Sequence, residues 1–279
     1  MNTVAKTFML MAALTALFMI AGQAMGGQQG MIIALIMALG LNFFAYWNSD
    51  KLALAMNHAR EVSPAEAGDL HALVAGLAAR AGLPKPRVYV IDEATPNAFA
   101  TGRNPEHAAV AVTTGLLRAL ERHELEGVIG HELAHIKHRD ILIGSIAAVM
   151  AGAISYLATM AQWAMLFGGG RRDGEGGGNP VVMLVTMLVA PLAATLIQMA
   201  ISRSREYLAD ATGAEICGHP KSLASALNKL ANYNAQRPMD VNPASAQMYI
   251  VNPLSGGGVA NLFSTHPPME ERVRRLMSM

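Results

Sequence analysis

Four long stretches of the chain are almost wholly apolar, and polar segments separate them. They cover residues 7–24, 31–47, 141–167 and 180–201. Each is close to or above the roughly 17 to 20 residues that a helix needs to cross the hydrocarbon core of a bilayer. The pattern predicts about four transmembrane helices, arranged as two hairpins.

The first two runs are separated only by GGQQG, so we expect one membrane hairpin over residues 1–47. A cleaved signal peptide is the alternative for the first run, because Lys6 gives it a basic start. No convincing small-residue cleavage site precedes a polar region, and a second apolar run follows almost at once. Tyr46 and Trp47 close the second run as an interfacial aromatic belt does. A retained hairpin is therefore the favoured interpretation.

The other two runs predict a second membrane hairpin over residues 141–201, with the Gly-rich segment 168–179 as its loop. Burial as helices of a soluble core is the alternative for both. The run 141–167 contains no charged residue, which favours a lipid environment. Pro191 would kink a spanning helix, and membrane helices tolerate such kinks.

The polar segments, residues 48–140 and 202–279, carry both helical and strand patterns. A capping-box start at Ser63 and a stop at Gly82 predict a helix between them. Short apolar runs bounded by turn residues predict three strands, and amphipathic spacing predicts four more helices. The predicted strands are residues 86–91, 98–101 and 108–113. One predicted helix starts at Gly115, and the other three cover residues 202–217, 219–234 and 267–277. The predicted fold class is an α+β membrane protein, mainly helical with a small β-sheet.

The composition supports membrane spans and excludes some classes of function. Hydrophobic residues make up 52% of the chain and charged residues 15%, with a mean hydropathy of +0.30. Soluble domains usually carry about a quarter charged residues. A net charge of +1 gives no indication of nucleic-acid binding. The single Cys217 excludes an internal disulfide and a Cys-rich zinc site.

The basic residues indicate the orientation in the membrane. All but two of the 21 Lys and Arg residues lie in residues 48–140 and 202–279 or at Lys6, the exceptions being Arg171 and Arg172. Basic residues near the membrane stay on the cytoplasmic side. An even number of spans puts both termini on one side. We therefore expect a multi-pass protein of the cell (inner) membrane, with its polar bulk and both termini in the cytoplasm.

The segment His131-Glu132-Leu133-Ala134-His135 matches H-E-x-x-H. Residues four apart on a helix lie close together on one face, so both imidazoles can bind one ion. Glu132 lies about 100° further round the helix, where it can hold a water molecule without being a ligand. Zinc is the expected metal for two imidazoles and a carboxylate with one open position.

The same short pattern also occurs by chance on solvated helices, but its apolar neighbours argue against that here. Val128, Ile129 and Ile136 make the other faces of the helix apolar. His138 lies on nearly the same face as His131, but it is about 10.5 Å further along the axis, too far to share one metal with it. We do not expect His138 to be a ligand.

A third ligand has to come from another segment, and SRSREYLADATGAE at residues 202–215 is the best source. Glu206 and Asp210 are four residues apart, so both carboxylates face the same way on a helix. One could bind the metal while the other accepts a hydrogen bond from a ligand imidazole. Two carboxylates on a solvated helix face are the alternative.

These motifs occur in an order that resembles the HtpX group of membrane zinc endopeptidases, which are relatives of the type I CAAX prenyl proteases. The similarity covers H-E-x-x-H, an apolar hairpin, SRSREYLAD and THPPMEERVRRL, together with two leading spans and PNAFATG. The resemblance implies that His131, His135 and Glu206 bind one zinc ion. It also implies that Glu132 is the general base and Asp210 the partner of a ligand histidine.

The resemblance extends to four further residues. Asn97 and Ala98 are similar to the edge-strand Asn-Ala of gluzincin proteases, which pairs with the substrate backbone. His266 and Arg272 match positions that stabilise the oxyanion in the prenyl-protease relatives. The alternatives are a turn residue for Asn97, a helix-start residue for His266 and surface charge for Arg272.

The resemblance implies a gluzincin-like zinc endopeptidase that acts on misfolded or damaged membrane proteins at the cytoplasmic face of the bilayer. The implied division is a hairpin (1–47), a protease part (48–140), a second hairpin (141–201) and a second protease part (202–279). A prenyl-protease-like enzyme and a non-enzymatic membrane scaffold with an incidental metal site are the alternatives. The sequence is silent on oligomeric state.

Overall fold

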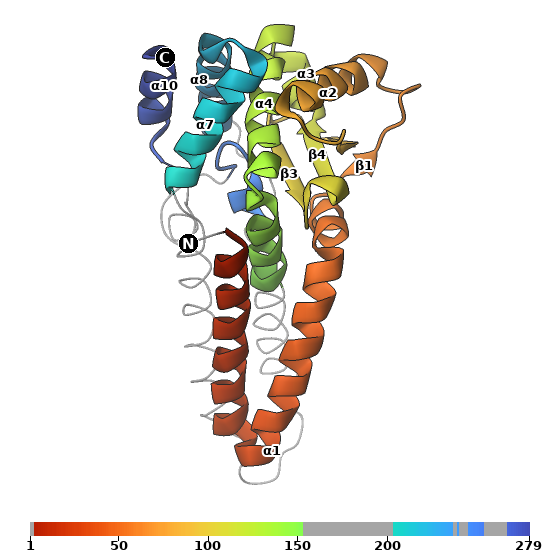
Figure 1. Cartoon of the computed structure of the whole chain (residues 1–279), viewed down its shortest axis with the longest axis vertical. Coiled ribbons are helices and arrows are strands. Elements are labelled where there is room, and N and C mark those ends of the chain that lie inside the picture. Colours follow the sequence, from red (N-terminus) through yellow and green to blue (C-terminus); the bar gives the residue numbers. More distant parts are fainter. Residues whose placement is uncertain (1–2, 153–202, 237–238, 240–244, 254–266) are drawn as a thin grey trace.

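The computed structural model describes residues 3–152, 203–236, 239, 245–253 and 267–279. Figure 1 shows an elongated molecule in which the two arms of α1 form a stalk, and the sheet and the other labelled helices gather at one end of it. The described residues are mainly helical and contain one four-stranded sheet. This agrees with the expected α+β class.

Helix α1 (Thr3–Met56) consists of two apolar helices joined by a sharp turn. The turn falls at Gly26 and Gly27, and Gly27 has a φ of +59°, which glycine adopts without steric cost. The two arms, both long and apolar enough to cross a membrane, are Val4–Ala24 and Gly26–Met56. The two apolar helices expected in this region are confirmed, although the second continues beyond Trp47.

The outward surface of this helical hairpin is strongly apolar. Its exposed large side chains are Phe8, Met9, Ile20, Ile32, Ile33, Ile36, Met37, Leu39, Phe43, Phe44 and Trp47. Soluble proteins rarely expose so many large apolar side chains on one hairpin, whereas lipid-facing helices require them. Between the arms, Asn42 donates a hydrogen bond from Nδ2 to Thr15 Oγ1 at 2.8 Å, so these polar groups face each other.

A shorter apolar helix, Asp140–Gly152, lies beside the first arm of α1 (Figure 1). Leu142, Ile143 and Ile146 bury their side chains against Leu10 and Leu14 of that arm. The rest of the third apolar run, the whole of the fourth and the Gly-rich segment lie outside the described residues. The second membrane hairpin therefore stays a prediction.

The sheet has the strand order β1-β2-β4-β3. Its strands are β1 (Arg60–Glu61), β2 (Arg87–Ile91), β3 (Ala98–Gly102) and β4 (Ala108–Thr113). Strands β2 and β4 are parallel and the other pairs are antiparallel. The three expected strands are confirmed to within one residue, and β4 is central, as its small apolar residues indicated. Strand β1 was not expected, because two charged residues carry no strand pattern.

Helix α2 (Gly68–Ala81) begins later than the capping-box pattern predicts. Ser63 and Glu66 do exchange the hydrogen bonds of a capping box, from Ser63 N–H to Glu66 Oε2 and from Glu66 N–H to Ser63 Oγ. These bonds close a turn and not a helix, because Ala67 has non-helical dihedrals (φ −140°, ψ 55°). Gly82 ends α2 in the left-handed conformation, as expected.

Helix α4 (Arg122–Lys137) is the central element of the part that carries the sheet. It packs against α2, α7, α8 and β3, and Figure 1 shows it between α7 and the sheet. The remaining helices are α3 (Thr114–Ala119), α7 (Arg203–Cys217), α8 (Pro220–Gln236) and α10 (Met269–Met277). The helix expected from Gly115 onward is thus split into α3 and α4, and the later helices lie where predicted.

The surroundings of α4 explain why its sequence is so apolar. Val128, Ile129, Leu133, Ala134 and Ile136 are completely buried in the main core. At its start, Glu121 and Glu124 form a capping box, and Glu124 also accepts hydrogen bonds from α8. The helix is held from several sides, which fixes the polar residues on its remaining face.

Candidate metal centre

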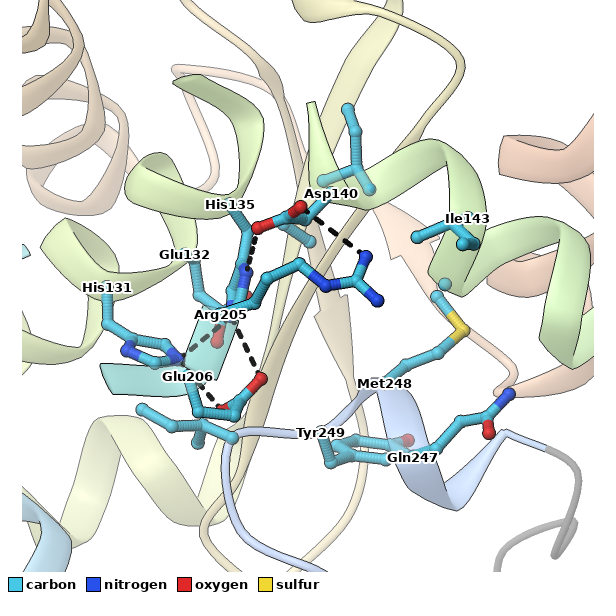
Figure 2. Close-up of a pocket in the computed structure, with 14 residues that line it drawn as sticks. His131, Glu132, His135, Asp140, Ile143, Arg205, Glu206, Gln247, Met248 and Tyr249 are labelled. Carbon is cyan, nitrogen blue, oxygen red and sulfur yellow. Dashed lines mark hydrogen bonds and ion pairs between the residues drawn. The ribbon is translucent and has the colours of Figure 1, made fainter. Parts of the chain in front are cut away.

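Helix α4 directs His131 and His135 to the same point. Their Nε2 atoms are 3.1 Å apart, and both side chains lie next to Glu132 (Figure 2). Glu206, in the first turn of α7, reaches this point from the other side. Its Oε2 lies 3.8 Å from His131 Nε2, and its Oε1 lies 3.6 Å from His135 Nε2.

This donor set fits a zinc ion. Two ligands at about 2 Å from a tetrahedral zinc are roughly 3.3 Å apart, which is close to the separations between the three residues. Their ligand atoms all lie within 4.8 Å of one another, and the group is buried apart from partial exposure of His135. His138 is not in the group, as expected, and its Nε2 lies 3.0 Å from Thr212 Oγ1.

Asp210 contacts His131 on the side of the ring that faces away from the metal position. Its Oδ1 is 2.9 Å from His131 Nδ1, so it can accept the ring N–H and leave Nε2 for the metal. Arg272 of α10 donates two hydrogen bonds to the same carboxylate, from Nε at 2.8 Å and from Nη2 at 2.7 Å. The geometry thus resolves which of the two α7 carboxylates faces the metal position.

Glu132 is buried beside this position. Its Oε1 is a buried atom with no hydrogen-bond partner among the described residues, so a ligand or water can still bind it. Burial raises the pKa of Glu132 to about 7 despite the neighbouring His135, which acts in the opposite direction. A carboxyl group with such a pKa can both accept and return a proton near neutral pH.

The pKa values of the two histidines are shifted in opposite directions. Burial lowers the pKa of His131 to about 4, although its bond to Asp210 acts against this. Burial would also lower the pKa of His135, but the carboxylates of Asp140 and Glu206 outweigh it and raise that pKa to about 9. Metal binding requires both rings to be neutral, so it displaces a proton from His135.

The contact between His135 and Asp140 was not predicted from the sequence. Asp140 Oδ2 lies 3.5 Å from His135 Nδ1, and Asp140 Oδ1 lies 3.6 Å from Arg205 Nη1 (Figure 2). Asp140 follows His135 by five positions, a spacing that puts two side chains on different faces of a continuous helix. The chain turns at Arg139, and no signal in the sequence indicated that turn.

A cavity of about 60 Å³ adjoins the metal position, enough for a few water molecules. It is lined by residues of four regions, namely β3, α4 with the helix that follows it, α7, and the segment 247–250. Tyr249 of that segment packs edge-on against Phe99 of β3, with ring centroids 5.1 Å apart. The segment covers the part of β3 that faces the site.

Asn97 and Ala98 form hydrogen bonds with residues 250 and 251 of the same chain. Asn97 donates from Nδ2 to the carbonyl of Val251, and its Oδ1 accepts the N–H groups of Ala98 and Val251. The carbonyl of Ala98 accepts the N–H of Ile250 at 3.0 Å. A role for these two residues in substrate binding stays a prediction, and it requires residues 250–251 to move aside.

The structure describes only one of the two residues predicted to stabilise the oxyanion, His266 and Arg272. His266 lies outside the described residues. Arg272 is completely buried, and besides Asp210 it bonds the carbonyl of Ile250 from Nη1 at 2.8 Å. Its Nη1 also lies 3.9 Å from Glu206 Oε2, so the guanidinium is close to the metal position. It is not surface charge, and its contribution to catalysis stays a prediction.

Comparison with known proteins decides the family. The model of peptidase family M48 matches residues 64–279. The chain belongs to peptidase family M48. A "Protease HtpX homolog" from Desulfatibacillum aliphaticivorans is 58% identical over 97% of this chain and 88% of its own length. Another from Ralstonia pickettii is 59% identical over 98% of this chain and 96% of its own.

A solved structure shares the fold of this chain. The crystal structure of S. mikatae Ste24p matches with a TM-score of 0.53 at 19% sequence identity. The match covers 96% of this chain and 62% of that one. Family membership and the His-His-Glu group identify a membrane zinc metallopeptidase, with His131, His135 and Glu206 as its metal-binding group. The non-enzymatic scaffold is thereby excluded.

The close approach of α7 to α4 gives a prediction for this M48 site. A Cβ on Gly213 would lie 2.7 Å from both N and Cα of His131, which are backbone atoms that cannot give way locally. We expect Gly213→Ala to push α7 away, weaken zinc binding and destabilise the fold by about 1–3 kcal/mol. Competition with a chromogenic chelator and thermal unfolding measure the two effects.

Gly76→Ala in α2 is the matched control, because a Cβ there meets nothing within 4 Å. It should stabilise the protein by about 0.5–1 kcal/mol and leave zinc affinity unchanged. Wild-type zinc affinity in Gly213→Ala would show that the two helices do not depend on this contact.

Proposed function

We propose that this M48 zinc metallopeptidase cleaves unfolded or damaged membrane proteins at the cytoplasmic face of the inner membrane, as part of membrane-protein quality control. The observation that carries the proposal is the position of the metal site beside an apolar helix. Ile141, Ile143 and Gly144 of the apolar helix Asp140–Gly152 line the same cavity as His135 and Glu206. A segment emerging from the bilayer beside that helix would meet the site directly.

The chemistry follows from the residues around the metal position. When bound, zinc would act as a Lewis acid that lowers the pKa of a water molecule and polarises the scissile carbonyl. Glu132 accepts a proton from the attacking water and later returns it to the leaving amine. Asp210 holds His131 through Nδ1 and thereby keeps its Nε2 directed at the metal.

Substrate and transition-state contacts form the second part of the proposal. An extended substrate would add a strand at the outer edge of β3, next to Asn97 and Ala98 and to the cavity-lining Ala100, once residues 250–251 have moved aside. His266 and Arg272 would offset the negative charge that develops on the carbonyl oxygen. The buried location of Arg272 beside Glu206 supports its electrostatic part in this scheme.

The proposed activity is tested with the full chain in detergent or nanodiscs. We expect cleavage of a destabilised membrane protein and of unfolded casein, loss of cleavage with a zinc chelator and recovery with added zinc. A folded variant of the same membrane protein should resist. If a prenylated C-terminal peptide is cleaved instead and the unfolded substrates are not, the prenyl-protease alternative is correct.

The proposed topology has four spans, with residues 48–140 and 202–279 in the cytoplasm. The distribution of Lys and Arg supports this orientation. We expect Gly174→Cys, in a Cys217→Ser background, to react in intact spheroplasts with a maleimide that cannot cross the membrane. Met279→Cys in the same background is the control and should react only after permeabilisation. Equal protection of both cysteines would contradict a second spanning hairpin.

A further inference from the structure

The two histidine ligands are held in similar ways, but only one of their partners was expected. His131 turns Nε2 to the metal position and Nδ1 to Asp210, at 2.9 Å. His135 turns Nε2 to His131 and Glu206, at 3.1 and 3.6 Å, and its Nδ1 lies 3.5 Å from Asp140 Oδ2. Asp140 thus faces the Nδ1 side of His135 as Asp210 faces that of His131, at an ion-pair distance of 3.5 Å where Asp210 is within hydrogen-bond distance.

We propose that Asp140 is a positioning residue for the ligand His135 and that it links the two zinc-bearing helices through Arg205. A metal-binding imidazole commonly donates its other N–H to a carboxylate, which fixes the tautomer and the orientation of the ring. Asp140 is only 8% exposed, so its carboxylate interacts mainly with the protein and not with water. Asp140 does not touch the metal position, and it acts through His135.

The contact with Arg205 extends the role of Asp140 to the other helix. Arg205 precedes the ligand Glu206 in the first turn of α7, and its Nη1 lies 3.6 Å from Asp140 Oδ1. One carboxylate therefore touches a ligand on α4 and the neighbour of a ligand on α7. Figure 2 shows Asp140 above His135, with the Arg205 side chain extending toward it. This contact joins the helices at the end of the site nearest the apolar helix.

The backbone at Arg139 is what places Asp140 there. On a continuous helix, residues five apart point roughly 140° away from each other. Helix α4 ends at Lys137, Arg139 has a left-handed φ of +59°, and the next helix begins at Asp140. A non-glycine residue in this conformation costs about 1 kcal/mol or more, and such strain is found preferentially at functional sites.

The test is zinc affinity of the full-length protein, measured by chelator competition, together with the visible spectrum of the Co²⁺-substituted enzyme. We expect Asp140→Ala to weaken zinc binding about 10- to 100-fold and to change the Co²⁺ spectrum. Asp140→Asn keeps an acceptor oxygen and should recover part of the affinity. Because these measurements need no substrate, their result is independent of the proposed substrate class.

Asp50 offers a matched control. It is similarly buried, at 6% exposure, and it accepts a hydrogen bond from Arg87 at 2.6 Å away from the metal position. Asp50→Ala should lower stability and leave zinc affinity and the Co²⁺ spectrum unchanged. Equal loss of zinc affinity in Asp50→Ala and Asp140→Ala would overturn the proposal, because general destabilisation would then explain both.

Variants of Arg139 test the same idea without altering the carboxylate. Asn adopts the left-handed conformation readily and β-branched residues do not. We therefore expect Arg139→Asn to retain zinc affinity within about twofold, and Arg139→Val to weaken it toward the level of Asp140→Ala. Wild-type affinity and spectrum in both Asp140→Ala and Arg139→Val would overturn the proposal.

Discussion

Glu132→Gln is expected to keep zinc bound and to lower kcat/KM for an unfolded protein substrate by about 10²- to 10⁴-fold, the usual contribution of a general base. Glu132 lies beside the metal-binding group and is not one of its three members. The substitution preserves shape and removes only the ability to take up a proton. Zinc content by metal analysis and initial rates of cleavage measure the two effects separately.

Glu126→Gln on the same helix is the control. Glu126 pairs with Arg122 one turn earlier, at 3.7 Å, and does not line the cavity. Its variant should match the wild-type protein in both zinc content and rate. Undiminished turnover in Glu132→Gln would place the base on another residue, and loss of zinc would make Glu132 a ligand.

The residues that depend on local spacing could be predicted from the sequence. His131 and His135 meet at one point because four residues return a helix nearly to the same face, and Glu206 and Asp210 face one way for the same reason. Spacing alone could not decide which carboxylate binds the metal, since both satisfy it. That choice depended first on the family resemblance and then on the distances to His131.

The residues that depend on tertiary contacts could not be predicted in this way. The partner of His135 is Asp140, and it is in place only because Arg139 leaves the helical conformation. Asn97 bonds the carbonyl of Val251, 154 residues later in the chain. Such contacts are set by how whole elements pack, and no local pattern encodes them.

Arg272 is the clearest example, because its position in α10 gives an amphipathic helix pattern and no indication of burial. In the structure it is fully buried, and its guanidinium forms a bidentate pair with Asp210. A guanidinium matches a carboxylate in this geometry, and a lysine cannot reproduce it. The pair fixes the carboxylate that in turn holds His131, so α10 takes part in building the metal site.

Arg272→Leu should therefore be strongly destabilising, by about 3–5 kcal/mol, because it leaves the Asp210 carboxylate buried without the guanidinium that balances its charge. Chemical denaturation measures the loss, and Arg274→Leu on the same helix is the control. Arg274 is largely exposed, and among the described residues its side chain pairs with Glu271, so its variant should stay within about 0.5 kcal/mol of the wild-type protein.

A double variant separates the structural role of Arg272 from its proposed catalytic role. If Arg272 serves to neutralise Asp210, then Arg272→Leu combined with Asp210→Asn should recover about 0.5–3 kcal/mol relative to the sum of the single variants, since the uncompensated charge is gone. If Arg272 also stabilises the oxyanion, that stabilisation is lost in Arg272→Leu regardless of Asp210. Activity per zinc-loaded molecule should then stay low in the double variant even where stability returns. Recovery of both would assign Arg272 to the support of Asp210 alone, and recovery of neither would mean that the ion pair is not what holds α10 against α7.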